Sequence, residues 1–243
     1  MDTDVPHAAR IWNYWMGGTD NFAADRAAGD AVAQVYPEIA VMARESRGFL
    51  IRAVRYLAEE RGIRQFLDIG TGLPTMQNTH EVAGPPSTVV YVDNDPLVLA
   101  HAEKLAPGTT FVYADYHDPE LILAAAAESL DFRQPIAVMF MGVLGYEPDL
   151  DVVRSLVSRT FGATVPGSRL VLWDGTNTTP EVVAGAKRLE QSGGVPYIVR
   201  SPAELETCFL GLPLDEPGLV PITRWRADGG PFIDAYGAIA AQV

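Results

Sequence analysis

The chain has 243 residues, with 18 Lys and Arg against 31 Asp and Glu, which gives a formal net charge of −13. Proteins that bind the backbone of DNA or RNA, or an anionic membrane surface, need clustered basic side chains. The composition therefore argues against nucleic acid and membranes as partners. Hydrophobic residues make up 48% of the chain, enough for one large domain, or for one domain with a small cap.

A single cysteine, Cys208, excludes disulfide frameworks and zinc sites built from several thiolates. The acidic start, Met1–Asp4, lacks the basic and apolar segments of a signal peptide. No apolar run reaches the roughly 18 residues that a membrane-spanning helix needs. We therefore expect a cytoplasmic protein.

Periodicity divides the chain into a helical N-terminal part and a long alternation of short apolar segments with helical ones. In the first part, residues 31–43 and 47–60 are expected to be helices, the second of them amphipathic. The later alternation is typical of strands buried on both faces of a parallel sheet and of the helices that connect them. The expected strands are 65–69, 88–93, 110–113, 136–141 and 169–173, and the expected helices are 76–82, 96–105, 119–129 and 150–164.

Two further strand-like segments, 218–225 and 231–241, lie near the end of the chain. Between them, Asp228-Gly229-Gly230 is typical of a hairpin turn. We therefore predict an α/β fold: a Rossmann-like, doubly wound sheet of about seven strands, mostly parallel with an antiparallel C-terminal hairpin strand. Residues 1–60 are expected to form a helical cap packed on this core, and residues 61–243 the α/β domain.

The segment Asp68-Ile69-Gly70-Thr71-Gly72 follows the first expected strand and leads into a helix. Two glycines there let the backbone turn tightly and approach a ligand, although a tight turn without a ligand would use them too. A dinucleotide fingerprint would carry a third Gly or an Ala where this chain has Thr75. An Asp two residues before the first glycine also suits an amino-bearing ligand better than a pyrophosphate.

Carboxylates also follow the next two expected strands. Asp93 can accept hydrogen bonds from both hydroxyls of a ribose. Asp95, directly before Pro96, is typical of a helix N-cap followed by proline in the first turn. Asp115 ends the third strand. Because parallel strands end at one edge of a sheet, we expect Asp68, Asp93 and Asp115 to line one ligand-binding crevice.

This order of motifs resembles the class I S-adenosylmethionine-dependent methyltransferases. Within them it is similar to a bacterial family described simply as S-adenosyl methyltransferase. The resemblance covers almost the whole chain, and it is carried by the segments Ala9–Tyr14, Gly17–Phe22, Asp25–Arg26, Gln65–Thr75 and Val90–Pro96.

The resemblance implies S-adenosyl-L-methionine as cofactor and S-adenosyl-L-homocysteine as product. It also implies that Asp68 holds the cofactor's amino group, Asp93 its ribose hydroxyls and Asp115 its adenine amine. The residues expected at the cofactor are Asp68, Gly70, Thr71, Gly72, Asp93, Asn94, Asp115, Tyr116, Met141 and Gly142.

The segment 14–22 is the expected lid over the acceptor, because it combines aromatic side chains with a glycine pair that could act as a hinge. A packed cap without ligand contact is the alternative. A general base is needed only for a hydroxyl or a protonated amine, and Tyr14, His80, Asp115 and Tyr116 are unranked candidates. His7, His101 and His117 lack metal-ligand spacing, which argues against a metal site. The residues expected at the lid and substrate are Tyr14, Trp15, Gly18, Asn21 and Phe22.

These features predict methyl transfer to an unidentified small molecule. Relatives often carry a His after the Val-Leu pair that follows the fourth strand, whereas Leu144 is followed here by Gly145. A cofactor-binding sensor or scaffold without catalysis is therefore the alternative, and an NAD-dependent oxidoreductase is a more remote one. Assembly as a homodimer stays open.

Overall fold

The computed structural model describes residues 2–74, 77–102 and 108–243. Its centre is a seven-stranded sheet with the strand order β3-β2-β1-β4-β5-β7-β6. The first five strands run parallel, and β7 is antiparallel to both β5 and β6. This architecture confirms the predicted fold class. The strands are β1 (Gln65–Ile69), β2 (Thr88–Asp93), β3 (Thr109–Tyr113), β4 (Ala137–Met141), β5 (Arg169–Gly175), β6 (Val220–Pro221) and β7 (Ala235–Ala241).

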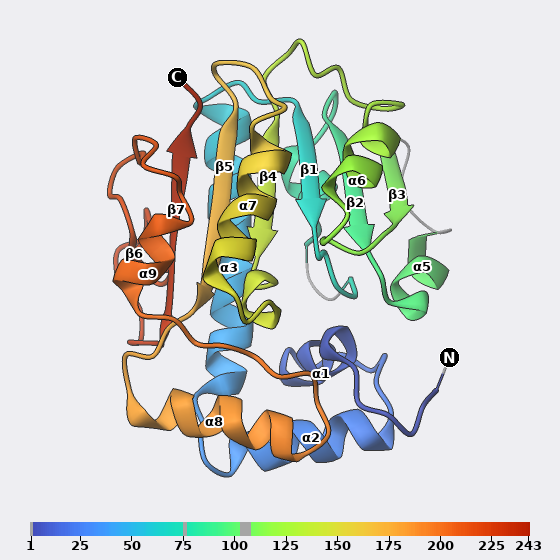
Figure 1. Ribbon diagram of the computed structural model, residues 1–243, viewed down its shortest axis with the longest axis vertical. Coiled ribbons are helices and arrows are strands. Elements are labelled where there is room, and N and C mark those ends of the chain that lie inside the picture. The colour runs from blue at the N-terminus through green and yellow to red at the C-terminus, as the bar shows by residue number, and fades with distance from the viewer. Residues whose placement is uncertain (1, 75–76, 103–107) are drawn as a thin grey trace.

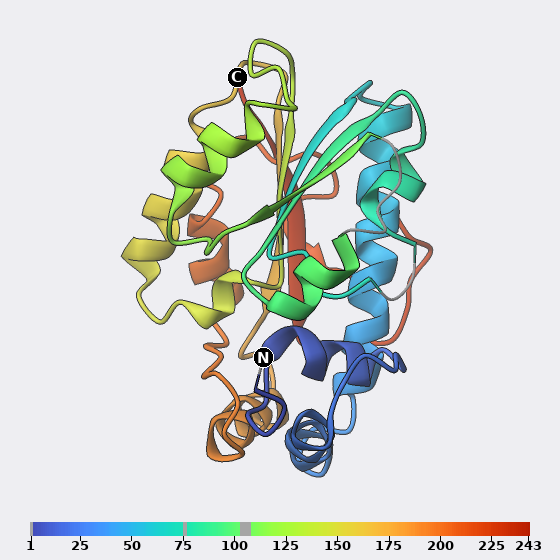
Figure 2. The same ribbon diagram turned by 90° about the vertical axis from the view of Figure 1, so that its right-hand side faces the viewer.

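Helices cover both faces of the sheet (Figures 1 and 2). One face carries α3 (Ile39–Glu59) and α4 (Thr79–Ala83), and the other carries α6 (Pro119–Ala126) and α7 (Leu150–Phe161). A third group, α1 (Ala8–Trp15), α2 (Ala23–Ala33) and α8 (Pro180–Gln191), lies across the carboxyl ends of the parallel strands. The remaining helices are α5 (Pro96–Ala102), the 3-10 helix η1 (Leu144–Tyr146) and α9 (Pro202–Thr207).

The core has one apolar cluster on each side of the sheet, because alternate residues of a strand point to opposite faces. In β1, Phe66 packs with α3, whereas Leu67 and Ile69 pack on the side of α6 and α7. The cluster on the α3 side also contains Ile11 and Trp15 of α1. The cap and the sheet thus share one core, while the domain boundary at residue 60 stays a prediction.

Four helices begin with the same local signal, a capping side chain followed by proline. A side-chain oxygen accepts a hydrogen bond from a backbone N–H of the first turn in α5, α6, α8 and α9. The expected capping role of Asp95 is thereby confirmed. The other three capping residues are Asp118, Thr179 and Ser201.

The predicted helices 31–43 and 47–60 were wrong in their boundaries. Residues 31–33 belong to α2, and α3 runs without a break from Ile39 to Glu59. Residues 44–48 are polar and end in Gly48, so they resemble a helix boundary. No proline interrupts them, however, and a single glycine is tolerated within a long helix.

The C-terminal strands pair in antiparallel fashion as predicted, but the tight turn was wrong. Strand β6 contains only two residues, and residues 222–234 connect it to β7. The connection contains Trp225, which is fully buried and packs edge-on against Phe49 and Tyr56 instead of continuing the strand. Helices α8 and α9 were not predicted at all.

Two predicted elements reach beyond what the structure describes. Thr75 and the first residue of the expected helix 76–82 lie outside the described residues, as does the end of the expected helix 96–105. Across the described ranges, no helix combines the length and the apolar character needed to cross a bilayer.

Candidate functional site

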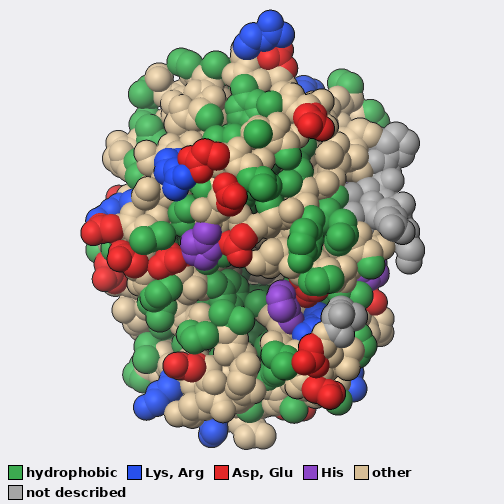
Figure 3. Space-filling model, turned by 45° about the vertical axis from the view of Figure 1, so that its right-hand side comes forward, with side chains coloured by type: hydrophobic (Ala, Val, Ile, Leu, Met, Phe, Trp, Pro, Cys, Tyr) green, Lys and Arg blue, Asp and Glu red, His purple; other side chains and the backbone are tan. Residues whose placement is uncertain are grey.

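A cavity of about 320 Å³ opens at the carboxyl edge of the parallel strands, between the sheet and α1. Figure 3 shows an apolar hollow in the surface with histidine and carboxylate side chains at its rim. The structure brings together in this cavity all ten residues that the sequence predicted for cofactor binding: Asp68, Gly70, Thr71, Gly72, Asp93, Asn94, Asp115, Tyr116, Met141 and Gly142.

The loop after β1 needs its glycines. Gly70 and Gly72 adopt φ angles of +71° and +65°, where other residues are strained. A Cβ atom on Gly70 would also lie 2.5 Å from the side chain of Val143. The backbone N–H groups of Gly70 and Thr71 both donate to the carbonyl oxygen of Val92, at 2.8 and 3.1 Å. The loop is therefore fixed to the end of β2, with its backbone along the cavity.

Asp68 presents a buried carboxylate to the cavity. Its Oδ2 accepts a hydrogen bond of 2.7 Å from the Thr79 hydroxyl, while Oδ1 has no hydrogen-bond partner among the described residues. Burial raises the pKa of Asp68 to about 6, against the opposing effects of Thr79 and Arg47. A buried acceptor without a partner is unfavourable, so a ligand with a donor group would relieve it.

Arg47 lies at the same end of the cavity and was missed by the sequence analysis. It comes from α3, lines the cavity and is only 9% exposed. Burial lowers the pKa of Arg47 and the charge of Asp68 raises it, but an arginine stays cationic in proteins. The cavity thus has a buried cation and a buried carboxylate at one end. A polar residue inside an amphipathic helix was the signal that could have found it.

Asp93 holds the glycine loop and the following turn together. Its Oδ2 accepts from the Gly72 N–H at 2.8 Å, and its Oδ1 accepts from the Asp95 N–H at 2.9 Å. Burial raises the pKa of Asp93, and these two hydrogen bonds oppose that shift. A carboxylate has about four acceptor positions, so both oxygens can still accept hydroxyl groups from the cavity.

The far end of the cavity, at β3, is polar and better solvated. Asp115 accepts from the Asn94 side chain at 2.8 Å and contacts the His117 ring at 2.6 Å. The other ring nitrogen of His117 lies 2.8 Å from Glu147. Burial would raise the pKa of Asp115, but hydrogen bonds from His117 and Asn94 outweigh it and hold that pKa below its ordinary value. Tyr116 stacks on His117, with ring centroids 4.1 Å apart.

The lid covers the cavity with a different face from the one predicted. The cavity is lined by Met16 of the segment 14–22 and, ahead of that segment, by Trp12 and residues 7–9. The predicted lid residues Tyr14, Gly18, Asn21 and Phe22 are not part of the cavity wall, and Trp15 lines a smaller neighbouring cavity.

Hydrogen bonds explain where these other lid side chains point. The Tyr14 hydroxyl donates to Asp30 at 2.6 Å, the Trp15 indole donates to the carbonyl of Gly29, and the Asn21 amide donates to Asn13. Each of them thus stabilises the packing of the cap rather than facing the large cavity.

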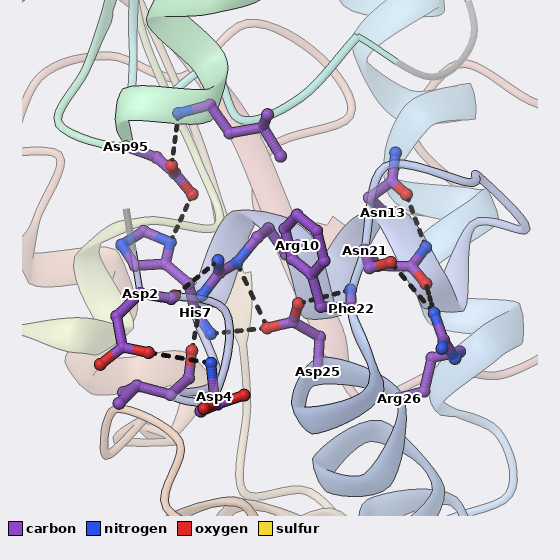
Figure 4. A network of polar contacts seen from close by, with 12 residues as sticks. Asp2, Asp4, His7, Arg10, Asn13, Asn21, Phe22, Asp25, Arg26 and Asp95 are labelled. Atoms are coloured by element: carbon purple, nitrogen blue, oxygen red, sulfur yellow. Dashed lines mark hydrogen bonds and ion pairs between the residues drawn. The ribbon is translucent and has the colours of Figure 1, made fainter.

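A polar network closes the lid onto the sheet (Figure 4). The His7 ring lies 2.8 Å from the carboxylate of Asp95, which caps α5. The backbone N–H of His7 donates to Asp25, and Asp25 forms a buried ion pair with Arg10 at 3.3 Å. Arg10 also lies over the ring of Phe22. The network joins α1 and α2 to the end of β2, over the cavity.

The candidate general bases occupy different places. His80 is not part of the cavity wall, and its ring hydrogen-bonds the Tyr91 hydroxyl at 2.8 Å. Tyr116 lines the cavity, but burial raises its pKa; the hydrogen bond to Asp30 raises the pKa of Tyr14. A tyrosine with a raised pKa is a poor base near neutral pH.

Within the described ranges, no group of three or more His, Cys, Asp or Glu side chains is arranged to hold a metal ion.

Comparison with known proteins gives a consistent assignment. A family model described as S-adenosyl methyltransferase matches residues 1–240. A candidate methyltransferase from Thermobifida fusca YX is 39% identical, with a TM-score of 0.92 over 99% of this chain and 96% of that one. A duf574 family protein from Streptomyces avermitilis MA-4680 is also 39% identical, with a TM-score of 0.95 over 100% and 99%. No curated protein matches the sequence significantly.

More distant structures share the fold. The 1,6-didemethyltoxoflavin-N1-methyltransferase of Burkholderia thailandensis, solved with 1,6-didemethyltoxoflavin and S-adenosylhomocysteine, is 16% identical, with a TM-score of 0.51 over 80% of this chain and 78% of that one. The motifs, the sheet topology and the match over nearly all residues agree with one another. The chain therefore belongs to the S-adenosyl methyltransferase family.

Proposed function

We propose that this protein transfers a methyl group from S-adenosyl-L-methionine to a small molecule bound beside it in the large cavity. The observation that carries the proposal is that the buried side chains of Asp68 and Arg47 both line one end of that cavity, close enough for each to shift the other's pKa. A buried carboxylate and a buried guanidinium match the ammonium and carboxylate groups of an amino acid, such as the methionine end of the cofactor.

The other polar residues fit the rest of the same molecule. Asp93, with free acceptor positions beside Gly72, suits ribose hydroxyls. Asp115 and Asn94, on the β3 side, suit the donor and acceptor edge of adenine. When bound, S-adenosyl-L-methionine supplies an activated methyl group and a neutral leaving group.

The protein's own contribution is placement and exclusion of water. The described residues of the wall on the β4 and β5 side are Met141, Gly142, Val143, Tyr146 and Trp173, and none of these carries a carboxylate or an imidazole. We therefore propose an acceptor atom that arrives with a free lone pair, such as an aromatic nitrogen or a neutral amine. The lid residues Trp12 and Met16 would hold this acceptor against the cofactor and keep water out.

The amino-acid end can be tested separately from the nucleoside end. S-adenosylhomocysteine carries both, whereas 5′-methylthioadenosine lacks the amino-acid end. We expect Arg47→Met to weaken S-adenosylhomocysteine binding by about tenfold to a hundredfold, as for loss of a hydrogen bond to a charged group. Binding of 5′-methylthioadenosine should change less than twofold. Isothermal titration calorimetry measures both affinities.

Arg44→Met is the matched control, because Arg44 is exposed on the same helix; it should change neither affinity. Equal losses for both ligands in Arg47→Met would contradict the assignment of Arg47. A protein that bound NAD and not S-adenosylhomocysteine would refute the proposed cofactor. Binding without turnover on a panel of small amines and heterocycles would favour a sensor over an enzyme.

A further inference from the structure

A second, smaller cavity of about 40 Å³ lies behind the lid. Its lining residues come from α1, α2 and α8, which form the layer across the strand ends (Figure 1), and from the start of α3, the end of β5, η1 and residues 197–199. Trp12 and Tyr146 line both this cavity and the larger one, so they form the partition between the two. Its apolar lining includes Trp15, Val32, Ile39, Met42, Val182 and Leu189.

Three polar side-chain groups of this wall form hydrogen bonds with residues outside it. The Trp15 indole donates to the Gly29 carbonyl at 3.2 Å, and the Tyr36 hydroxyl donates to Asp234 at 2.9 Å. The Tyr197 hydroxyl donates to Asp174. The aromatic rings therefore present their apolar surfaces to the cavity. Such a space is unfavourable for a charge and suits an apolar group.

Small residues keep this space open. A Cβ atom on Gly185 of α8 would lie 3.1 Å from Tyr36, and one on Gly175 would lie 3.2 Å from Tyr197. The available volume holds about three water-sized groups, which corresponds to a short alkyl branch or the edge of a ring. The cavity thus has a defined size as well as a defined polarity.

Its position relative to the large cavity suggests its role. The polar residues of the large cavity lie toward α3 and β3, whereas its apolar wall, with Met141 and Trp173, lies toward β4 and β5. Trp12 and Tyr146 belong to that apolar side and also line the smaller cavity, so the two spaces adjoin at these two side chains. A molecule that reacts at the apolar side of the large cavity lies next to the smaller one.

We propose that the smaller cavity binds an uncharged, apolar arm of the methyl acceptor, whose reacting atom lies in the large cavity. This inference rests on the proposed function and adds the substrate class: a small, uncharged compound with a ring edge or short alkyl group next to its nucleophilic atom. The partition residues Trp12 and Tyr146 then determine which arms are accepted.

The test uses 4-fluorophenol as an uncharged probe and 4-fluorobenzoate as a charged one, followed by ¹⁹F NMR in the presence of saturating S-adenosylhomocysteine. Ala186→Leu fills the smaller cavity, because Ala186 lines it. Ala184→Leu is the matched control, since Ala184 is exposed on the same helix. Calorimetry with S-adenosylhomocysteine reports on the large cavity in each variant.

We expect saturable binding of 4-fluorophenol to the unaltered protein and to Ala184→Leu, and at least tenfold weaker binding to Ala186→Leu. Binding of 4-fluorobenzoate should be at least tenfold weaker than that of 4-fluorophenol. The affinity for S-adenosylhomocysteine should be equal in all three proteins. Should Ala186→Leu not fold, Leu189→Ala enlarges the same cavity and should bind 6-fluoroindole at least tenfold more tightly than the unaltered protein does.

The inference is overturned if 4-fluorophenol does not saturate, if it binds Ala186→Leu as well as the unaltered protein, or if S-adenosylhomocysteine displaces it. Each of these results leaves the cofactor assignment standing. If S-adenosylhomocysteine itself does not bind, the proposed function is refuted instead. Repeating the 4-fluorophenol titration without S-adenosylhomocysteine distinguishes failure of this inference from failure of the proposed function.

Discussion

Replacing Asp68 by Asn is expected to have opposite effects on ligand affinity and on the stability of the empty protein. Asp68 is 2% exposed, and burial raises its pKa from 3.8 to about 6. A raised pKa means that the folded state binds the proton more tightly than the unfolded state does. The stability that Asp68 contributes is therefore fully present below about pH 4 and is lost as the pH rises through 6.

The size of both effects follows from this shift. Two pKa units correspond to about 3 kcal/mol, so Asp68→Asn should raise the free energy of unfolding at pH 8 by up to that amount. Ligand binding should require the ionised carboxylate. At pH 5, one unit below the pKa, about one molecule in eleven is ionised, and affinity for S-adenosylhomocysteine should be about tenfold weaker than at pH 8.

The assay is calorimetry with S-adenosylhomocysteine at pH 5, 6, 7 and 8, together with urea unfolding of the empty protein at pH 5 and 8. Asp68→Asn should bind more weakly at pH 8 and show no pH dependence over this range. 5′-Methylthioadenosine, which lacks the amino group, should bind independently of pH in both proteins. It also controls for titration of His117 at the other end of the cavity.

An affinity of the unaltered protein that stays constant from pH 5 to 8 would refute the assignment of Asp68 to the amino group. So would a pH dependence that persists in Asp68→Asn. If the substitution destabilised the empty protein at pH 8, the inference that burying the ionised Asp68 carboxylate costs stability would be wrong.

Gly142→Ala should lower the free energy of unfolding by about 2 kcal/mol or more, because φ is +79° and the added Cβ would lie 2.5 Å from the Trp173 ring. At Gly211 φ is +72°, but no described atom lies within 4 Å of an added Cβ. In the same urea assay Gly211→Ala should therefore lower the free energy of unfolding by about 1 kcal/mol. Equal decreases in the two variants would show that the contact with the Trp173 ring is unimportant. Asp93→Asn should weaken S-adenosylhomocysteine and 5′-methylthioadenosine alike, by about tenfold or more. The NH2 group of Asn would face the backbone N–H of either Gly72 or Asp95, both of which donate to Asp93, and both ligands carry the ribose. Calorimetry that showed a loss for only one of them would contradict the ribose assignment.

Much of the fold could be predicted from local rules. Buried parallel strands are uniformly apolar, and parallel strands end at one edge, so the shared location of Asp68, Asp93 and Asp115 followed from the order of short segments. Asp95 before Pro96 was likewise a local signal for a helix start. These predictions needed no knowledge of which helix packs where.

The residues that sequence analysis missed depend on tertiary packing. Arg47 stands in a polar stretch that looked like a break between helices, and only the uninterrupted α3 brings it to the cavity. The cavity-lining residues of the N-terminal segment differ from the predicted ones for a related reason. The rotation of α1 about its axis is set by contacts such as that of Trp15 with Gly29 of α2, and it turns Trp12 and Met16, rather than Tyr14, toward the cavity.

The core that the cap shares with the sheet limits how new acceptor specificity could be engineered. Ile11 and Trp15 pack in the same apolar cluster as Phe66 of β1 and Trp173 of β5. Replacing the first sixty residues by those of a relative would therefore introduce core side chains that do not fit this sheet, together with the new lid. Specificity is better altered by single substitutions at positions such as Trp12 or Ala186 than by exchanging the cap as a module.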